Sequence, residues 1–260
     1  MVDIRKEKIF NKRLKDIIFT IFNRLENNNN AFFASNGEEA FLNSYLKNNV
    51  KIVFDVGANM GEYSKLLLEK SKELNKNIEL HIFEPLTTCF KIIQTKFSSE
   101  DKIFLNNFGI SNEEIETEIY FDIEGSSLAS LYERDLSTIN KRLNKKEKIK
   151  LQRLDNYIIE NNITQIDLLK IDVEGHEVSV LNGIGKFLKP DFINVIQFEY
   201  GGANIDSRTY LKDLYTIFKN KGYVVCKIMR NGIQLRDYEN KMENFQYANY
   251  LALSPALIND

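Results

Sequence analysis

The sequence predicts an α/β fold built on a mostly parallel sheet of seven strands, with helices on both faces. From residue 51 onward, short apolar runs rich in β-branched residues alternate with helical patterns, which is typical of parallel sheets. A glycine-containing turn joins the first of these strands directly to the next helix. The length of 260 residues suffices for one large α/β domain with an appendage.

The strands are expected near 51–56, 78–83, 102–107, 166–172, 192–199, 222–229 and 246–253. The helices are expected near 61–74, 86–97, 154–162, 177–188 and 207–220. In the first of them, Tyr63, Leu66 and Leu67 form an apolar face. Residues 51–260 are therefore interpreted as the main domain, and residues 1–50 as a helical extension.

A helical pattern also covers residues 1–26 of this extension. Its apolar face is made by Phe10, Leu14, Ile17, Ile18, Ile21, Phe22 and Leu25. The polar tract 26–30 then ends the helix, and a second helix is expected over 37–47 after Asn36 as its cap. The first helix could cover the functional site, contact a second copy of the chain or lie on a membrane surface. Acidic residues interleave with Lys and Arg, so the membrane is the least favoured of these roles.

Composition narrows the class of protein. The chain is 43% hydrophobic and 28% charged, with a net charge of −2, and these values argue against a duplex nucleic-acid partner. Cys89 and Cys226 lie far apart in predicted elements, which indicates two buried thiols in a reducing cytoplasm. No apolar run approaches the roughly 20 residues of a membrane span, and the charged N-terminus does not resemble a signal peptide.

The stretch 51–61 combines a short strand with an acid and two glycines, Asp55, Gly57 and Gly61. Strand, glycine turn and helix form the layout of a nucleotide-type cofactor loop, in which glycine lets the backbone approach the ligand closely. Glu84 follows 23 residues after Gly61 at the end of the next apolar run, where an acid can bind ribose hydroxyls. The alternative, a plain strand–turn–helix corner, does not explain Glu84.

The spacing of the glycines distinguishes between cofactors. A dinucleotide fingerprint has a middle glycine that admits a pyrophosphate, and this loop lacks it. Asp55 would repel phosphates but would suit an amine-bearing cation. S-adenosylmethionine has a ribose, an ammonium and a sulfonium group and no phosphate, so it fits this pattern.

A second informative stretch, 166–177, ends another buried strand. Side chains alternate along a strand, so Lys170, Asp172 and Glu174 are expected on one side of it. A strand buried on both faces should be almost entirely apolar. Lys170 and Asp172 depart from this rule, and such departures tend to occur at functional sites. Gln197 and Glu199 repeat the pattern on strand 192–199 and are expected to face the same crevice. The alternative interpretation of Lys170 and Asp172 is a buried structural ion pair.

His176 is the candidate general base, because an imidazole pKa lies near neutrality. The other histidine, His81, lies within an apolar strand, where a core role is expected. Glu177 is explained equally well as an acid favoured at a helix N-terminus. A divalent metal could be held by Asp172, Glu174, His176 and Glu199. Their spacing matches no compact ligand motif, so no metal site is predicted.

Residues 112–150 interrupt the alternation of strands and helices. A strand is expected over 116–122, a turn at Gly125-Ser-Ser127, and a weakly helical segment from Leu128 to Lys148. An insertion of this kind at the carboxyl edge of a sheet commonly forms a substrate lid or wall.

Several motifs resemble the FkbM family of S-adenosylmethionine-dependent methyltransferases. They are Phe54-Asp-Val-Gly-Ala-Asn-Met-Gly61, Phe83-Glu-Pro85, Asn107-Phe-Gly-Ile-Ser111, Leu169-Lys-Ile-Asp-Val-Glu-Gly-His-Glu177 and Val180-Leu-Asn-Gly183. The resemblance spans about residues 35 to 200. It implies the class I (Rossmann-like) methyltransferase fold, with seven strands of which the last is antiparallel. It also implies O-methylation, often of sugar or polyketide hydroxyls.

The sequence thus favours an O-methyltransferase for a sugar hydroxyl, in a nucleotide-linked sugar or a surface polysaccharide precursor. In this hypothesis the methionine part of the cofactor lies against Asp55, Gly57, Asn59 and Gly61. Glu84 binds the ribose, and Asn107 lies beside the adenine. Asp172, Glu174 and His176 line the acceptor pocket, where one of them takes the hydroxyl proton. A nicotinamide-dependent oxidoreductase and a non-catalytic cofactor-binding scaffold are the alternatives, and a homo-oligomer through the N-terminal helices is left open.

Overall fold

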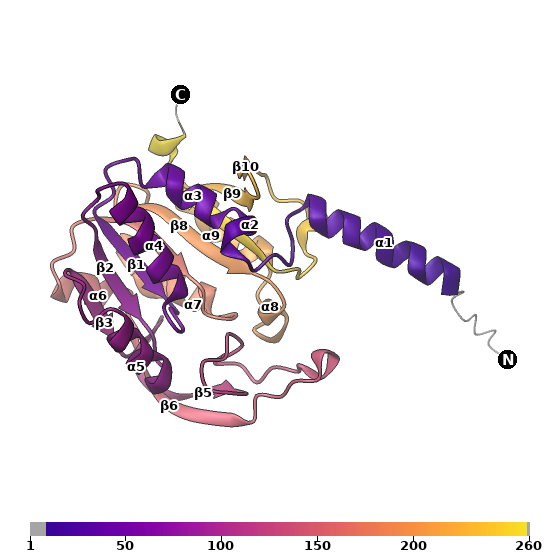
Figure 1. Ribbon diagram of the computed structural model, residues 1–260, viewed down its shortest axis with the longest axis horizontal. Coiled ribbons are helices and arrows are strands. Elements are labelled where there is room, and N and C mark those ends of the chain that lie inside the picture. The colour runs from indigo at the N-terminus through magenta and orange to yellow at the C-terminus, as the bar shows by residue number, and fades with distance from the viewer. Residues whose placement is uncertain (1–8, 259–260) are drawn as a thin grey trace.

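An eight-stranded sheet forms the centre of the computed structural model, which describes residues 9–258 (Figure 1). Its strands are β1 (Ile52–Val56), β2 (Glu79–Phe83), β3 (Ile103–Asn106), β7 (Ile166–Ile171), β8 (Ile193–Tyr200), β9 (Val224–Met229), β10 (Gly232–Leu235) and β11 (Ala248–Leu253). They lie in the order β10-β9-β11-β8-β7-β1-β2-β3. The five strands from β8 to β3 pair in parallel, whereas β11 runs antiparallel between β8 and β9. This order confirms the predicted mostly parallel methyltransferase sheet with an antiparallel last strand.

The predicted number of seven strands is wrong, because β10 adds an eighth at the edge. β10 pairs antiparallel with β9 from Gly232 opposite Met229 to Leu235 opposite Cys226. The turn between them is Arg230-Asn231, and Gly232 begins β10; the dipeptide Asn231-Gly232 is a hairpin signal that the prediction overlooked.

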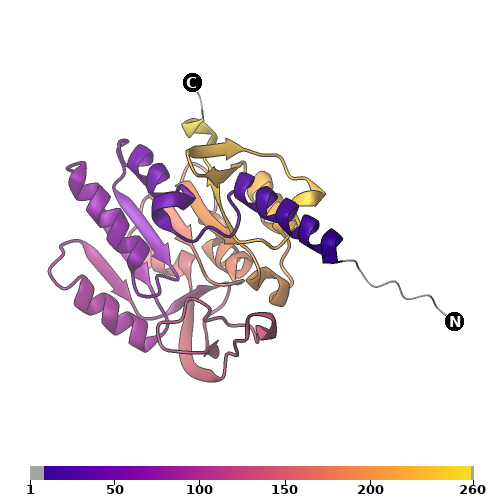
Figure 2. The same cartoon turned by 45° about the vertical axis from the view of Figure 1, so that its right-hand side comes forward.

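Helices cover both faces of the sheet, as predicted (Figures 1 and 2). One face carries α6 (Leu154–Glu160), α7 (Glu177–Ile184) and α9 (Leu211–Asn220), and the other carries α3 (Glu38–Tyr45), α4 (Glu62–Glu73) and α5 (Thr87–Lys96). Strand side chains alternate between the two apolar cores, so that Phe54 joins one core and Val53 the other. The predicted helices agree with these bounds to within a few residues.

The predicted insertion holds most of a second, three-stranded sheet. Its strands are β4 (Gly109–Ser111), β5 (Ile115–Phe121) and β6 (Lys145–Arg153), in the order β4-β6-β5. The expected strand over 116–122 is confirmed as β5. The expected weak helix from Leu128 to Lys148 is wrong. Those residues are mostly irregular around a single 3₁₀ turn, Ser137–Ile139, and their last part belongs to β6. Charged residues dominate this segment, so no continuous apolar face is present to stabilise a helix on a neighbour.

The N-terminal helix α1 (Ile9–Leu25) extends away from the body of the molecule (Figure 1). The predicted start of this helix, at residues 1–8, lies outside the described residues, as does the side chain of Phe10. A short helix, α2 (Phe33–Asn36), follows, and α3 buries Phe41 and Leu42 in the core. The division of the chain at residue 50 stays a prediction, since α3 shares the core of the main domain.

Two sequence-based expectations concern cysteines and membranes. Cys89 and Cys226 are both buried and free, in agreement with the prediction of two thiols. Among the helices within residues 9–258, none has the length and apolar character needed to cross a membrane.

Asp167 connects four elements at the amino end of the parallel strands. Its Oδ2 accepts hydrogen bonds from the backbone N–H groups of Lys51 (2.7 Å) and Ile52 (2.9 Å), at the start of β1. Its Oδ1 accepts one from Asn194 Nδ2 on β8 (3.0 Å), and its carbonyl accepts one from the Tyr45 hydroxyl on α3 (2.7 Å). The buried Asp167 carboxylate therefore holds three parallel strands in register.

We expect Asp167→Ala to lower the free energy of unfolding by about 2–3 kcal/mol, because it removes the acceptor of two backbone N–H groups at the start of β1 and of the Asn194 amide. Urea unfolding followed by circular dichroism measures the effect. The matched control is Asp191→Ala, which removes a carboxylate that is 72% exposed and paired only with Lys189. That control should change stability by less than about 0.5 kcal/mol. Equal losses in the two variants would contradict the role given to Asp167.

Candidate active site

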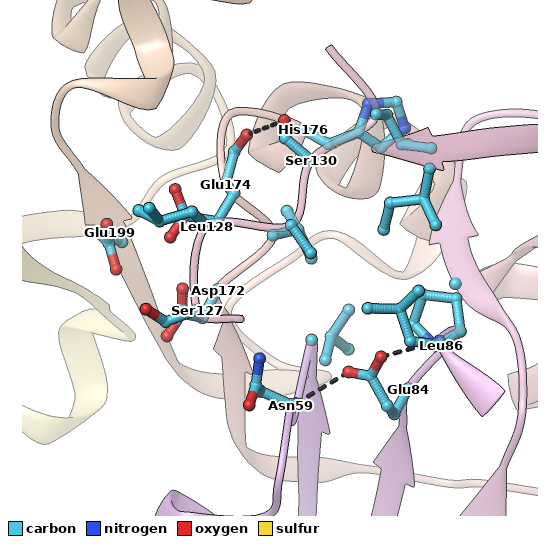
Figure 3. Close-up of a pocket in the computed structure, with 18 of the residues that line it drawn as sticks. Asn59, Glu84, Leu86, Ser127, Leu128, Ser130, Asp172, Glu174, His176 and Glu199 are labelled. Atoms are coloured by element: carbon cyan, nitrogen blue, oxygen red, sulfur yellow. Dashed lines mark hydrogen bonds between the residues drawn. The ribbon is translucent and has the colours of Figure 1, made fainter. Parts of the chain in front are cut away.

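A cavity of about 410 Å³ opens at the carboxyl ends of β1, β7 and β8 (Figure 3). The turn after β1, the segment after β2, and the insertion form its walls. The residues that line it are Ala31, Phe33, Glu38, Val56, Gly57, Asn59, Glu84, Pro85, Leu86, Gly109, Ile110, Ile119, Ser126, Ser127, Leu128, Ala129, Ser130, Leu131, Ile149, Leu151, Asp172, Val173, Glu174, His176, Glu199 and Tyr247. The predicted insertion thus contributes one wall, from Ser126 to Leu131.

The glycines of the loop are required by packing within the protein itself. Gly57 has φ +83°, and a Cβ atom there would lie 1.9 Å from the backbone oxygen of Asp172. Gly61 has φ +75°, and a Cβ atom there would lie 2.9 Å from the Phe97 ring. Gly57 lines the cavity, whereas Gly61 does not appear among the described lining residues. Gly57 is therefore needed because the turn after β1 packs directly against the backbone of the segment after β7.

Asp55 lies behind the loop and does not belong to the cavity wall as described. Its side chain is fully buried, and Oδ2 accepts a hydrogen bond from Ser64 Oγ (2.6 Å). Oδ1 has no hydrogen-bond partner within the described residues. Burial raises the pKa of Asp55, although Lys170 nearby acts in the opposite direction.

Glu84 faces the cavity from the end of β2, as expected. Its Oε2 accepts the backbone N–H of Asn59 and its Oε1 that of Leu86, both at 2.8 Å (Figure 3). Burial raises the pKa of Glu84 to about 8 despite these two donors. Asn59 also donates from Nδ2 to the Ser126 carbonyl (2.8 Å), which connects the loop to the insertion.

Asn107 has a supporting position. It is exposed and lies outside the described cavity wall. Its Nδ2 donates to the carbonyl oxygens of Glu84 (2.9 Å) and Pro85 (3.1 Å). Asn107 therefore holds the backbone that carries Glu84 in place.

Three carboxylates gather on the other side of the cavity (Figure 3). Asp172, Glu174 and Glu199 each bring a carboxylate oxygen to within 4.8 Å of the others. The sequence expectation that Asp172 and Glu174 share a side with Glu199 agrees with this arrangement. His176, the fourth residue considered as a metal ligand, does not belong to the group.

The Lys170–Asp172 ion pair is present as well, with Nζ 2.7 Å from Oδ2. Lys170 is buried, and its Nζ lies 4.8 Å from the centre of the Tyr63 ring. Attraction to Asp172, Asp55 and Glu38 raises the pKa of Lys170 even though burial opposes this change. The structural and functional interpretations of Asp172 are therefore compatible, because Lys170 holds one of its oxygens in place.

Glu174 adopts a left-handed backbone conformation, with φ +49°. Its Oε2 lies 2.6 Å from Arg134 Nη1, and its carbonyl accepts a hydrogen bond from Ser130 Oγ (2.8 Å). Burial and the charge of Asp172 raise the pKa of Glu174 to about 8, and Arg134 only partly counters this effect. Arg134 and Ser130 both come from the insertion, so the insertion fixes the position of Glu174.

Glu199 forms no ion pair with any residue in the described range 9–258. Burial raises the pKa of Glu199 well above its ordinary value, and the charges of Asp172 and Glu174 raise it further. Glu174 and Glu199 therefore both keep their protons to a higher pH than an ordinary glutamate does.

His176, which the sequence indicated as the general base, is bonded within the fold through its ring. Both ring nitrogens are engaged: Nε2 lies 2.9 Å from Ser111 Oγ, and Nδ1 lies 3.1 Å from the Tyr132 hydroxyl. Burial lowers the pKa of His176 to about 4, which settles the direction that the sequence left open. Figure 3 shows His176 apart from the three carboxylates. Its contacts connect the start of α7 to the insertion.

Glu177 has a structural role, as its alternative interpretation suggested. It is the first residue of α7 and is buried. Its Oε1 accepts the backbone N–H of Gly175 (3.1 Å), and its Oε2 accepts a hydrogen bond from Asn204 (3.2 Å). His81 is likewise buried in the core and bonded to the Tyr157 hydroxyl (2.7 Å), in agreement with its expected core role.

Sequence reasoning missed Glu38, which the N-terminal extension contributes to the cavity wall. Its Oε1 accepts a hydrogen bond from Gln197 Nε2 (2.5 Å), and Asn36 Nδ2 donates to Oε2. The Tyr63 hydroxyl donates to Gln197 Oε1 (2.9 Å), which links this network to Lys170. An acid two residues after the expected cap Asn36 was the available signal, but helix-start acids are common at protein surfaces. Arg134 offered no signal, because the insertion has no periodicity.

The family comparison agrees with this geometry. A model described as the methyltransferase FkbM domain matches residues 55–225, which is more than half of the chain. The matched range includes the loop after β1, Glu84 and the carboxylate group. No protein with a curated description matches the chain.

Several solved structures resemble the chain at low identity. Precorrin-6y C5,15-methyltransferase from Geobacter metallireducens GS-15 is 10% identical, with a TM-score of 0.41, over 83% of this chain and 87% of that one. Aeropyrum pernix fibrillarin in complex with S-adenosyl-L-methionine is 12% identical, with a TM-score of 0.42, over 80% and 68%. Burkholderia thailandensis 1,6-didemethyltoxoflavin-N1-methyltransferase, with S-adenosylhomocysteine bound, is 9% identical, with a TM-score of 0.44, over 97% and 93%. Likenesses this weak carry no argument about substrate or mechanism.

The assignment rests on the domain match and on what lies within it. The matched residues hold the glycine loop after β1, the buried acid after β2 and the parallel strands β2, β3, β7 and β8, whereas the antiparallel strand β11 lies beyond them. The chain therefore belongs to the FkbM family of S-adenosylmethionine-dependent methyltransferases.

Proposed function

We propose that the protein is an O-methyltransferase that acts on a hydroxyl group of a neutral or amine-bearing sugar, such as a surface polysaccharide precursor. The observation that carries this proposal is the group of Asp172, Glu174 and Glu199 within one cavity. Carboxylates and carboxyls hydrogen-bond well to neighbouring hydroxyls of a sugar ring. No Lys or Arg occurs among the described residues that line the cavity, so the wall attracts no phosphate or carboxylate.

The residues near Glu84 fit S-adenosylmethionine, the cofactor of this family. The carboxylate of Glu84 keeps lone pairs free for ribose hydroxyls after accepting the N–H groups of Asn59 and Leu86. Gly57 exposes backbone to the cavity, and the surplus of carboxylates nearby suits the cationic part of the cofactor. When bound, the cofactor supplies a methyl group on an activated sulfonium. The same family membership favours a methyltransferase over a nicotinamide-dependent oxidoreductase or a non-catalytic scaffold.

In this proposal Glu199, rather than His176, is the base that accepts the proton of the acceptor hydroxyl. Asp172 forms an ion pair with Lys170, and Glu174 forms one with Arg134. These pairs hold the two acids in place, so they are suited to orient the acceptor. Glu199 has no such cation within the described chain, and its raised pKa makes it a stronger base when ionised. As the oxygen–methyl bond forms, the hydroxyl proton passes to the Glu199 carboxylate.

A nucleotide-linked sugar fits the cavity less well than the sequence suggested. Its pyrophosphate would approach carboxylates without a cation to compensate the charge. A divalent ion between Asp172, Glu174 and Glu199 would remove this repulsion, so the two acceptor classes differ in their need for metal.

At a pH above about 8, where Glu84 is ionised, Glu84→Gln should weaken binding of S-adenosylmethionine by about 2–3 kcal/mol, because it replaces charge-assisted hydrogen bonds with neutral ones. Isothermal titration calorimetry measures the affinity. A carboxylate accepts ribose hydroxyls better than a carboxyl, so wild-type affinity should rise as the pH rises through about 8. Glu118→Gln, which alters a half-exposed acid on β5, is the matched control. If Glu84→Gln binds as the wild type does, the ribose assignment is wrong.

Glu199→Gln should lower kcat by roughly 10²–10⁴ and leave cofactor affinity intact. Because the pKa of Glu199 is raised, the base form accumulates only as the pH rises, so the wild-type rate should increase with pH above the ordinary range of glutamate. This increase should be absent in the variant. Steady-state kinetics over a pH series provides the measurement. If the variant keeps the wild-type pH profile, another group is the base.

The acceptor class is tested with monosaccharides, amino sugars and nucleotide sugars as substrates, each with Mg²⁺ and with a chelator. Release of S-adenosylhomocysteine reports turnover. We expect methylation of neutral or amine-bearing sugars that does not depend on Mg²⁺. Methylation of nucleotide sugars alone, and only with Mg²⁺, would instead assign the three carboxylates to a metal. Absence of transfer to any sugar, with cofactor bound, would contradict the proposed acceptor class.

A further inference from the structure

We infer that α1 is an interfacial helix that binds the chain to a membrane surface containing anionic lipids. The helix extends from the body, and its large apolar side chains are open to solvent (Figures 1 and 2). They are 48–71% exposed at Leu14, Ile17, Ile18, Ile21 and Leu25, and 38% exposed at Phe22. Exposure of so many large apolar groups on one element marks a surface that binds a partner.

The distribution of these side chains around the helix is amphipathic. At about 100° per residue, the six residues from Leu14 to Leu25 named above occupy an arc of about 140°. Phe19 is the one large apolar residue of α1 between Leu14 and Leu25 that lies outside this arc. The stripe is wider than the seam of a two-stranded coiled coil and resembles that of helices that lie in the plane of a membrane.

The charges of α1 indicate which partner the stripe binds. Within α1, four basic residues, Lys12, Arg13, Lys15 and Arg24, stand against a single acid, Asp16. At the same helical spacing, Arg13 and Arg24 border one edge of the stripe and Lys15 borders the other. This local surplus occurs in a chain whose net charge is −2, so it is a property of the helix. Anionic lipid headgroups complement cations on both edges of an apolar stripe.

A second copy of α1 fits this surface less well. Cations border both edges of the stripe, so pairing two copies would place like charges opposite each other. The only nearby acid after α1, Glu26, is already paired with Arg236 and lies 3.4 Å from Lys227. Glu26 is therefore compensated by the body of the molecule, and Asp16 is the acid that interleaves with the cations within α1.

The base of α1 is fixed to the body by the polar tract that follows it. Asn27 donates from Nδ2 to the carbonyl oxygens of Asn36 (2.7 Å) and Ile228 (3.1 Å). The backbone N–H of Asn29 donates to the Tyr247 carbonyl (2.8 Å). Ile233 and Leu235 on β10 are 45% and 65% exposed. They line two hollows together with Leu25 and Phe22, respectively, so the apolar surface continues onto the sheet edge.

Binding through α1 would also place the cavity near the bilayer. Ala31 and Phe33 follow this tract and line the cavity, as does Tyr247. If the proposed function holds, a sugar carried at the membrane surface could reach the site. Membrane binding itself does not depend on that function and is tested without turnover.

The test is flotation of the full chain with vesicles of phosphatidylcholine alone or mixed with phosphatidylglycerol. We expect binding to the anionic vesicles, weakened by high salt. Ile17→Glu should weaken vesicle binding at least about tenfold, because it replaces an isoleucine that enters the lipid with a charged side chain. The matched control is Ile159→Glu on α6, which is 54% exposed against 57% for Ile17, and it should bind as the wild type does.

Arg13→Gln combined with Arg24→Gln should weaken binding to anionic vesicles by about 30-fold and leave binding to neutral vesicles unchanged. Failure to float with anionic vesicles would overturn the inference, and so would equal losses in Ile17→Glu and Ile159→Glu. Sedimentation velocity without lipid is the complementary measurement. A dimer that dissociates on Ile17→Glu, in a chain that binds no vesicle, would assign the stripe to a second copy.

Discussion

The buried ammonium group of Lys170 connects the acidic side of the cavity to the core of the sheet. It pairs with Asp172, lies over the Tyr63 ring and is close enough to Asp55 and Glu38 for both to raise its pKa. One cation in the central strand β7 thus stabilises acids from α3, β1 and the segment after β7. A buried charge is costly without partners, and removal of one member of such a group leaves the others uncompensated. This mutual dependence explains how a charged residue is accommodated in an otherwise apolar strand.

The acids of the cavity differ in whether they have an ion-pair partner. Lys170 holds Asp172 and Arg134 holds Glu174, whereas Glu199 and Glu84 have no ion-pair partner within the described chain. Burial raises the pKa of both unpaired acids, as it does that of Glu174 despite Arg134, and for Glu84 only backbone N–H groups oppose the effect. A buried acid that is easily protonated can exchange a proton with a bound hydroxyl. An acid that accepts backbone N–H groups is instead held in a fixed position for recognition of a ligand.

The insertion determines how the site is completed. It contributes Arg134 and Ser130 to Glu174, Ser126 to Asn59, and Tyr132 to His176. These contacts bridge the cofactor side and the acidic side, so a change in the insertion would alter the position of several site residues together. The N-terminal extension acts similarly from the opposite direction, since Glu38 reaches the cavity and the tract after α1 binds Tyr247. The insertion and the N-terminal extension therefore both contribute to the acidic side of the cavity.

The sequence by itself determined the sheet, its helices, the loop after β1 and the position of Glu84, because each depends on periodicity or on glycine positions that are local to the chain. The proximity of Asp172 and Glu174 also followed from alternation along one strand. The same alternation on the neighbouring strand placed Glu199 in their crevice. Only the tertiary structure decided that Glu38 and Arg134 approach from distant segments, and that His176 uses both ring nitrogens within the fold. Hydrogen-bond partners and burial depend on contacts between residues far apart in sequence, and these contacts set both the pKa of a group and its freedom to react.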